Sequence, residues 1–242
     1  MRIPRFHEPQ PLAEHSEISL SENTAQHAIR VLRLRVGDEL ILFNGDGHDY
    51  YASISAAGKR DASVRILHRE VRAAESPLKI ELGQTLSRGE RMDFAVQKAT
   101  ELGCAVISPL FTERCEVKLT SERQDKRQRH WQQIAISACE QSQRNQIPDI
   151  AHPQPLVDWL DQVDADLKLV LHHHDTQPMG NLPRPVSVAL LIGPEGGLTE
   201  NEVTLAKSKG FIPVCFGPRV MRTETAPIVA SAILQYLWGD LG

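Results

Sequence analysis

The hydrophobic pattern of the chain changes near residue 75, and this change limits the folds that the sequence can adopt. Before it, short β-type runs dominate. After it, strand-like and helical segments alternate, which is typical of an α/β domain with a parallel sheet. The stretch 72–77, which holds two alanines, Ser76 and Pro77, has the composition of a linker. We therefore predict two domains, residues 1–72 and residues 73–242.

The first domain is predicted to be a small β-barrel or sandwich. Its β-type runs are expected at residues 39–43, 50–55 and 64–68. Residues 44–47, with the sequence Asn-Gly-Asp-Gly, interrupt the first two runs as a hairpin loop would. One short helix is expected near residues 24–32.

The second domain is predicted to contain strands and helices in turn. Strands are expected at residues 78–85, 105–110, 167–171, 186–192 and 212–216. Helices are expected at residues 89–102, 121–144 and 225–238. A further helix begins at the capping box of Thr199 and Glu202 and ends at Gly210. The short, mostly apolar runs that begin at residues 167 and 186 are typical of strands buried in a parallel sheet.

The composition excludes several classes of protein. The chain has 242 residues, of which 41% are hydrophobic and 24% are charged, so a disordered or collagen-like chain is excluded. No apolar run approaches the roughly 18 residues of a transmembrane helix. The N-terminal residues lack the apolar core of a signal peptide. We therefore expect a cytoplasmic protein that does not contact a membrane.

Metal and disulfide chemistry are not expected. The four cysteines, Cys104, Cys115, Cys139 and Cys215, show no C-x-x-C spacing, so reduced and mostly buried thiols are the stronger interpretation. The three histidines at residues 172–174 do not change this expectation, because neighbouring side chains of an extended segment point to opposite faces. One of them could still line a pocket.

Two loops in the last quarter of the chain are candidates for a ligand site, because ligands of open α/β sheets bind beyond the carboxyl ends of the strands. One is Gly193-Pro194-Glu195-Gly196-Gly197, and the other runs from Gly217 to Thr225. Glycines let a backbone approach a ligand closely and take positive φ. Neither loop has the spacing of a P-loop or of a Rossmann site. A plain strand-to-helix turn is the alternative for the first loop.

The second loop contains Arg222-Thr223-Glu224-Thr225 directly before the last predicted helix. Helix capping accounts well for Thr223 and less well for Glu224. Capping does not account for Arg222, and a guanidinium beside a carboxylate suits an anionic or carbonyl-bearing ligand. We therefore expect Arg222 to contact a ligand.

Basic residues cluster in two segments. Those of the first domain, with a neighbouring histidine, are Arg2, Arg5, His27, Arg30, Arg33 and Arg35. Those of the second domain are Arg123, Lys126, Arg127 and Arg129. The first group is predicted to contact phosphate groups, and a solvated face paired to Glu22 or Asp38 is the alternative. For the second group a solvated helix face is the simpler interpretation.

Five motifs extend over almost the whole chain. They are His27-Ala28-Ile29-Arg30-Val31-Leu32-Arg33 with Gly37-Asp38, Lys98-Ala99-Thr100-Glu101-Leu102-Gly103, Glu140-Gln141-Ser142 and Arg144 with Ile147-Pro148, Ile192-Gly193-Pro194-Glu195-Gly196-Gly197 with Glu202, and Arg222-Thr223-Glu224-Thr225-Ala226. In these motifs and their order the chain resembles the bacterial 16S ribosomal RNA uridine-N3 methyltransferases of the SPOUT superfamily. Met221 and Cys115 stand where leucine and serine are common in that family.

The resemblance implies a fold and partners. The fold is a PUA-like, RNA-binding β-barrel followed by a SPOUT-type α/β domain with a parallel sheet. The C-terminal segments of this second domain form a trefoil knot, which is a rare exception to ordinary chain topology. The methyl donor implied is S-adenosyl-L-methionine. The implied partners are 16S ribosomal RNA in the small ribosomal subunit and a second copy of the chain in a homodimer. No metal is implied.

With this resemblance, site residues can be assigned. Arg222 is the candidate for stabilising the oxygens of a uracil anion, and Glu224 is the weaker candidate for the base. The donor pocket is predicted to include Leu171, His172, Gly193, Pro194, Glu195, Gly196, Gly197, Gly217, Met221 and Thr225. Arg144 joins the predicted RNA contacts of the first domain. Arg144 and Glu101 are each expected either to face the substrate or to form a structural ion pair with another residue.

Two other functions stay open. One is a knotted methyltransferase that acts on another RNA position, such as a tRNA ribose. The PUA-like first domain and the Arg222–Ala226 motif disfavour it. The other is a ribosome-assembly protein that binds RNA and has a vestigial pocket. The intact glycine loops disfavour that function.

Overall fold

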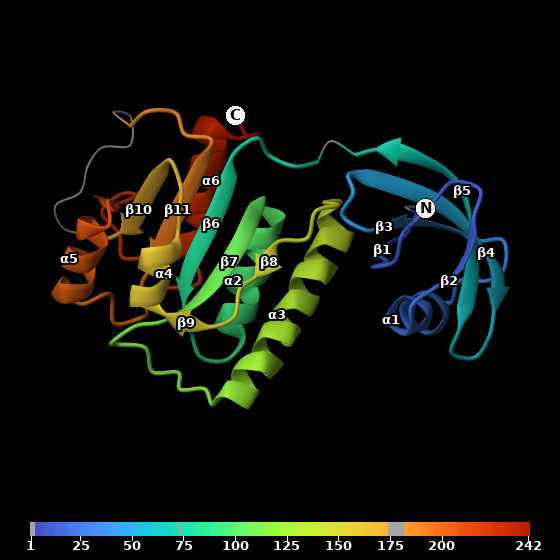
Figure 1. Ribbon diagram of the computed structural model, residues 1–242, viewed down its shortest axis with the longest axis horizontal. Coiled ribbons are helices and arrows are strands. Elements are labelled where there is room, and N and C mark those ends of the chain that lie inside the picture. The colour runs from blue at the N-terminus through green and yellow to red at the C-terminus, as the bar shows by residue number, and fades with distance from the viewer. Residues whose placement is uncertain (1–2, 73, 174–181) are drawn as a thin grey trace. The chain divides into compact units, whose positions relative to one another are not determined.

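The computed structural model describes residues 3–72, 74–173 and 182–242 (Figure 1). Its contacts divide the chain into two units. The first is Met1–Glu75 with Cys139–Ile147, and the second is Ser76–Ala138 with Pro148–Gly242. The predicted domains, 1–72 and 73–242, differ from these units chiefly in residues 139–147, which pack with the first unit.

The first unit contains a five-stranded sheet in the order β1-β3-β4-β5-β2. Its strands are β1 (Arg5–His7), β2 (Glu17–Ser19), β3 (Glu39–Phe43), β4 (His48–Ala57) and β5 (Ala62–Val71). All pairs are antiparallel except β1 with β3, which is parallel. The three longer strands confirm the predicted runs. The sequence analysis missed β1 and β2, because three residues are too few to show alternation.

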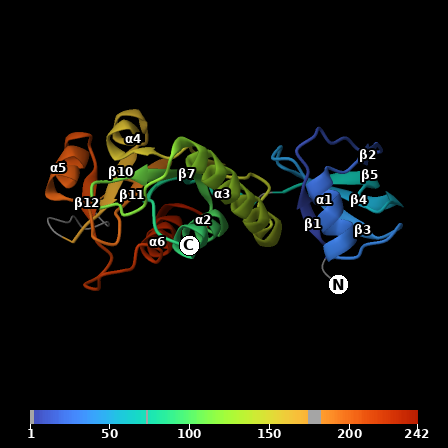
Figure 2. The same ribbon diagram turned by 90° about the horizontal axis from the view of Figure 1, so that it is seen from below.

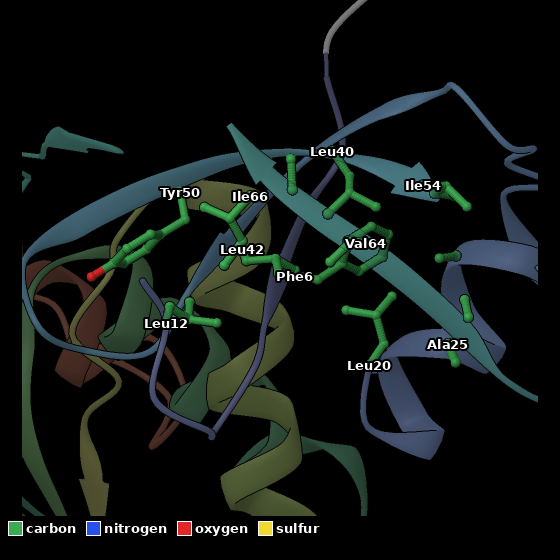
Figure 3. Close-up of a cluster of buried hydrophobic side chains, with 13 residues drawn as sticks. Phe6, Leu12, Leu20, Ala25, Leu40, Leu42, Tyr50, Ile54, Val64 and Ile66 are labelled. Atoms are coloured by element: carbon green, nitrogen blue, oxygen red, sulfur yellow. The ribbon is translucent and has the colours of Figure 1, made fainter. Parts of the chain in front are cut away.

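Alternating burial along the strands builds the core of this unit (Figure 3). On β4 the buried hydrophobic side chains are Tyr50, Ala52 and Ile54, and on β5 they are Ala62, Val64 and Ile66. This is the period of two that places every second side chain on one face of a sheet. The helix expected near residues 24–32 is present as α1 (Glu22–Gln26) followed directly by a π-helical turn, His27–Val31.

Buried charges join residues 139–147 to the first unit. Arg5 donates hydrogen bonds to the carbonyl oxygens of Cys139 and Arg144, each at 3.2 Å. The Arg5 guanidinium also forms an ion pair with Asp49 at 2.6 Å, and both side chains are only 4% exposed. Arg144 pairs with Glu75 at 2.6 Å. The RNA contacts predicted for Arg5 and Arg144 are therefore not supported, because both guanidinium groups are buried in protein contacts.

The second unit is built on a parallel sheet, as predicted. The strand order is β12-β10-β11-β6-β7-β8, with β9 beside β7, and every described pairing is parallel. The strands are β6 (Lys79–Thr85), β7 (Cys104–Phe111), β8 (Asp149–Ile150), β9 (Gln154–Pro155), β10 (Leu167–Leu171), β11 (Ser187–Ile192) and β12 (Ile212–Val214). The two-residue strands β8 and β9 were too short to predict. The trefoil knot implied by the resemblance stays a prediction.

Helices cover both faces of this sheet (Figure 2). They are α2 (Glu90–Glu101), α3 (Ser121–Ser142), α4 (Leu156–Gln162), α5 (Glu200–Ser208) and α6 (Ala226–Trp238). Side chains of α4 and α5 share one core with β10 and β11, whereas α2 and α6 pack together on the other face. Gly83 of β6 makes room for α4, because a Cβ there would lie 2.6 Å from the Trp159 ring.

No membrane-spanning helix, metal-binding cluster or disulfide is found among the described residues. No helix among them is long and apolar enough to cross a membrane. In the same residues, no cluster of three or more His, Cys, Asp or Glu could hold a metal ion. All four cysteines are free thiols, and Cys104 and Cys139 are buried. Burial raises the pKa of Cys139 to about 12, so this thiol stays protonated at neutral pH.

Candidate active site

A cavity of about 800 Å³ lies beyond the carboxyl ends of β10, β11 and β12. Ligands of open α/β sheets bind at this edge. Nearly all predicted donor-pocket and catalytic residues line it, namely Leu171, His172, Gly193, Pro194, Glu195, Gly196, Gly197, Gly217, Met221, Arg222 and Glu224. Thr225 does not line the cavity but begins α6. His173 also lines the cavity, and His174 lies outside the described residues.

Thr223 fixes the loop that carries Arg222 and Glu224. Its side chain is buried, and its hydroxyl donates to the carbonyl oxygen of Gly193 at 3.1 Å. The Thr223 hydroxyl oxygen also accepts a hydrogen bond from the side-chain amide of Gln84 at 3.2 Å. Three chain segments, the ends of β6 and β11 and the loop after β12, are thus joined at this hydroxyl. The expected capping role is not borne out, because α6 begins without a side-chain cap.

The glycines between Gly193 and Gly197 have different structural needs. Gly197 has a φ of +69°, which side chains rarely adopt. A Cβ on Gly193 would lie 3.1 Å from the backbone nitrogen of Leu198. A Cβ on Gly196 would meet only Arg114, at an ordinary 3.5 Å. A plain strand-to-helix turn therefore accounts for Gly193 and Gly197. It does not account for Gly196, which is exposed at the cavity.

Two arginines that the sequence analysis missed hold the outer side of this loop. Arg91, in the first turn of α2, pairs with Glu195 at 2.8 Å. Arg114, just after β7, donates to the carbonyl oxygen of Gly196 at 2.9 Å. Both follow strands whose carboxyl ends lie at the same edge of the parallel sheet. Extending the carboxyl-end rule from the last two loops to every strand would have found them.

The predicted capping box at the start of α5 is present and has a second use. The Glu202 carboxylate accepts from the backbone N–H of Thr199 at 2.8 Å, and the Thr199 hydroxyl accepts from the N–H of Glu202 at 3.2 Å. The other carboxylate oxygen of Glu202 accepts from the N–H of Glu113 at 2.8 Å. This bond ties the segment before Arg114 to the helix that follows the glycine loop.

The remaining predicted RNA contacts lie on the first unit. His27, Arg30, Arg33 and Arg35 are exposed, and Arg2 lies outside the described residues. Within the described part of the chain, no carboxylate forms an ion pair with these three arginines, so the paired alternative is not supported. Arg30 and Arg33 are not neighbours on one helix. The π-helical turn ends at Val31, and Arg33 has a φ of +59°.

Glu101, like Arg144, adopts the structural alternative. Lys98, one turn earlier on α2, pairs with Glu101 at 2.8 Å. Neither Lys98 nor Glu101 is among the residues that line the cavity. The second and third motifs thus supply the ion-paired residues Glu101 and Arg144, whereas residues of the fourth and fifth motifs line the cavity.

Comparison with known proteins gives the family. A family model described as an RNA methyltransferase domain matches residues 74–235, and one described as an RNA methyltransferase PUA domain matches residues 20–67. A ribosomal RNA small subunit methyltransferase E from Buchnera aphidicola is 38% identical over 99% of this chain and 98% of the relative. The protein of the same name from Bacillus subtilis is 29% identical over 94% of this chain and 93% of its own length.

Two solved structures are similar over their whole length. A methyltransferase from Legionella pneumophila, in complex with bound S-adenosylmethionine, has 43% identity and a TM-score of 0.97. A ribosomal RNA small subunit methyltransferase E from Neisseria gonorrhoeae, also bound to S-adenosylmethionine, has 39% identity and a TM-score of 0.94. Both similarities cover 100% of this chain and 100% of the other chain.

The fold and the site thus define an RNA methyltransferase with a PUA-like first domain and a parallel α/β second domain. The chain belongs to the ribosomal RNA small subunit methyltransferase E family. The family predicted from the five motifs is confirmed.

Proposed function

We propose that the protein transfers the methyl group of S-adenosyl-L-methionine to N3 of a uridine in 16S ribosomal RNA. One observation carries this proposal: the glycine loop and Arg222–Glu224 line one cavity and are joined by the hydrogen bond from Thr223 to Gly193. The family supports the RNA substrate, and the two similar structures with bound S-adenosylmethionine support the donor.

The cavity suits this donor. Its volume falls within the range of small-molecule sites. Leu171, Ile192 and Met221 offer apolar surface for a purine ring, and Glu195 and Glu200 are carboxylates suited to an ammonium group or ribose hydroxyls. When bound, S-adenosylmethionine supplies a methyl group on a positively charged sulfur, which a nucleophile displaces.

The residues of the loop after β12 then act on the base. Uracil N3 carries a proton at neutral pH and lies on the pairing edge, so the target base must be unpaired. Arg222 is exposed at the cavity, where its guanidinium can stabilise negative charge that develops on the uracil oxygens. Glu224 lines the same cavity and is the candidate for accepting the N3 proton. Thr223, buried between them, keeps both groups in position.

The proposal includes a cytoplasmic homodimer. Apolar side chains are exposed on and after α6, where Tyr236, Leu237 and Leu241 are 66%, 42% and 53% exposed. Exposed apolar patches often mark protein interfaces, and a two-fold contact is the commonest symmetry. Light scattering in the presence of dithiothreitol should give twice the mass of one chain, because the free cysteines support no shared disulfide.

The direct test uses small ribosomal subunits from cells that lack this enzyme. The subunits are incubated with the protein and S-adenosylmethionine, and the RNA is digested and analysed by mass spectrometry. 3-Methyluridine is the expected product. A ribose-methylated nucleoside would indicate a methyltransferase with another target. A folded protein that gives no product and no heat of donor binding would be an assembly factor instead.

The glycine loop gives a first prediction. Gly196→Val should weaken the binding of S-adenosylmethionine at least tenfold, or about 1.4 kcal/mol. The backbone at Gly196 has room for a Cβ, so the fold should tolerate the change, while the branched side chain occupies space at the cavity. Isothermal titration measures the affinity, and an unchanged melting temperature serves as the control. Wild-type affinity in the folded variant would show that Gly196 does not contact the donor.

The first unit gives a second prediction. Arg30→Gln combined with Arg33→Gln should weaken RNA binding and lower the salt slope of log affinity by roughly 0.7–0.9 for each phosphate group that is no longer bound. Both side chains are exposed and lack a carboxylate partner in the described part of the chain. Binding of S-adenosylmethionine should not change. A double variant that keeps the wild-type salt slope would assign these arginines to a solvated face.

A further inference from the structure

A basic groove lies on the second unit, outside the cavity described above. It consists of two hollows that share Leu119 and Arg127. The first, of about 420 Å³, is lined by Leu119, Arg123, Lys126, Arg127 and His130. The second, of about 250 Å³, continues along residues 86–89 and 117–119 to Met92 and Trp131. We use the term basic groove for these two hollows together.

Four basic residues of the basic groove lie on one face of a helix, and Arg88 and Lys118 also line its second hollow. Arg123, Lys126, Arg127 and His130 are spaced three, four and seven residues from the first, which places them on the same side of α3. The N-terminal end of a helix carries a partial positive charge, so cations there oppose the helix dipole. Among these residues Arg123 lies in the first turn of α3, where the dipole acts, so this cation is poorly placed for stabilising the helix.

The charges of this face are not neutralised by the protein. In the described residues, no carboxylate lies within ion-pair distance of Arg123, Lys126 or Arg127. Asp125, on the same helical segment, pairs with His152 at 3.1 Å. His130 is already paired with Asp93 at 2.9 Å. In the described residues, the three cations Arg123, Lys126 and Arg127 of α3 thus remain available for an external anion.

The basic groove ends beside the catalytic loop. Ser87 forms part of its wall, and the Ser87 hydroxyl donates to the hydroxyl oxygen of Thr223 at 3.5 Å. Thr223 lies between Arg222 and Glu224 in the sequence. The Cys115 thiol donates to the carbonyl oxygen of Leu86 and thereby joins the segments after β6 and β7. These two bonds connect the wall of the groove to the segment that carries Arg222 and Glu224.

We infer that the basic groove binds the phosphate backbone of the RNA substrate next to the target nucleotide. This inference rests on the proposed function and extends it, because it places a second RNA contact on the catalytic unit itself. From position 123 to position 130 a helix rises by roughly 10 Å, which is enough for more than one phosphate group. Phosphate contacts of this kind fix the register of an RNA without reading its sequence.

The test removes Arg123, Lys126 and Arg127 together and compares the result with a matched control. The groove variant carries Arg123→Gln, Lys126→Gln and Arg127→Gln, because glutamine is a good helix former. The control variant carries Lys79→Gln, Arg129→Gln and Lys209→Gln, which are exposed, lie outside both hollows and change the net charge equally. Binding of deproteinised 16S ribosomal RNA is measured over a range of salt concentrations. The affinity for S-adenosylmethionine and the rate of methylation of small subunits are measured separately.

We expect the slope of log affinity against log salt concentration to be lower in the groove variant by about 2 to 3. This value assumes that three phosphate contacts are lost, at roughly 0.7–0.9 each. The variant's KM for the subunit should rise at least tenfold, while donor affinity and kcat at saturation stay unchanged. The control should behave as wild type. A wild-type slope in the groove variant, an equal decrease in the control, or a failure of donor binding would overturn the inference.

Failure of the proposed function gives a different result. If the wild-type protein binds the RNA but produces no methylated uridine, the proposed reaction is wrong, and the slopes still decide whether the groove holds phosphate. If the wild-type protein binds neither the deproteinised RNA nor the small subunit, both proposals are overturned.

Discussion

Replacing Arg222 by alanine should lower kcat by about 10²- to 10³-fold, or about 2.7–4 kcal/mol, while the affinity for S-adenosylmethionine stays close to that of the wild type. The reason is that a cation directed at the uracil oxygens acts on charge that develops only in the transition state. The side chain is exposed at the cavity, and the fold does not depend on its burial. Single-turnover methylation of small subunits measures the rate at saturating donor and RNA.

Arg222→Lys serves as the matched variant. It keeps the positive charge but loses the planar fork of donors, so its rate should lie between those of wild type and Arg222→Ala. An Arg222→Ala variant that loses donor binding but keeps its rate at saturation would show instead that Arg222 binds the cofactor.

Arg5→Ala should destabilise the first unit by about 3–5 kcal/mol, the cost of leaving a buried charge without its partner. The substitution leaves Asp49 buried and unpaired and removes the donors to the carbonyl oxygens of Cys139 and Arg144. It also removes the guanidinium that lies 4.4 Å from the centre of the Phe43 ring. Urea unfolding followed by a probe in the first unit measures the free energy.

Two controls make this prediction specific. Arg30→Ala removes an exposed arginine of the same unit and should change the free energy of unfolding by no more than about 0.5 kcal/mol. Arg5→Met combined with Asp49→Leu removes both charges and should recover much of the stability, because buried ion pairs can often be replaced by apolar residues. Equal stability of Arg5→Ala and Arg30→Ala would show that the ion pair does not hold the unit together.

Local sequence patterns were enough to predict most of the fold. The β-type runs of β4 and β5 and the mostly apolar run of β11 identified their strands, because each pattern extends over five or more residues. Helix α4 was missed although Pro155, Leu156, Trp159 and Leu160 carry a helical pattern, because seven residues give only two turns.

Most of the candidate site could also be predicted, and the residues that could not be predicted have a physical reason in common. The glycine loop and Arg222 were found because one rule, the carboxyl ends of parallel strands, places them at the same edge. The burial of Arg5 could not be predicted, since its carbonyl acceptors lie 134 and 139 residues away in the sequence. Thr223 resembled a helix cap because it lies just before a helix. Its actual partners, Gln84 and Gly193, come from two other strand ends, so the neighbouring sequence did not indicate them.

The assignment of Cys139–Ile147 to the first unit has a consequence for synthesis. A ribosome makes Arg5 and Asp49 early, but the carbonyl acceptors of Cys139 and Arg144 are made only after the whole first segment of the second unit, Ser76–Ala138. At roughly 5–20 residues per second, the interval between Glu75 and Ile147 is on the order of several seconds. During that time Arg5 lacks two of its acceptors. The first unit therefore cannot complete its native contacts until Ile147 has been translated, although its two segments are still finished before the second unit, which extends to Gly242.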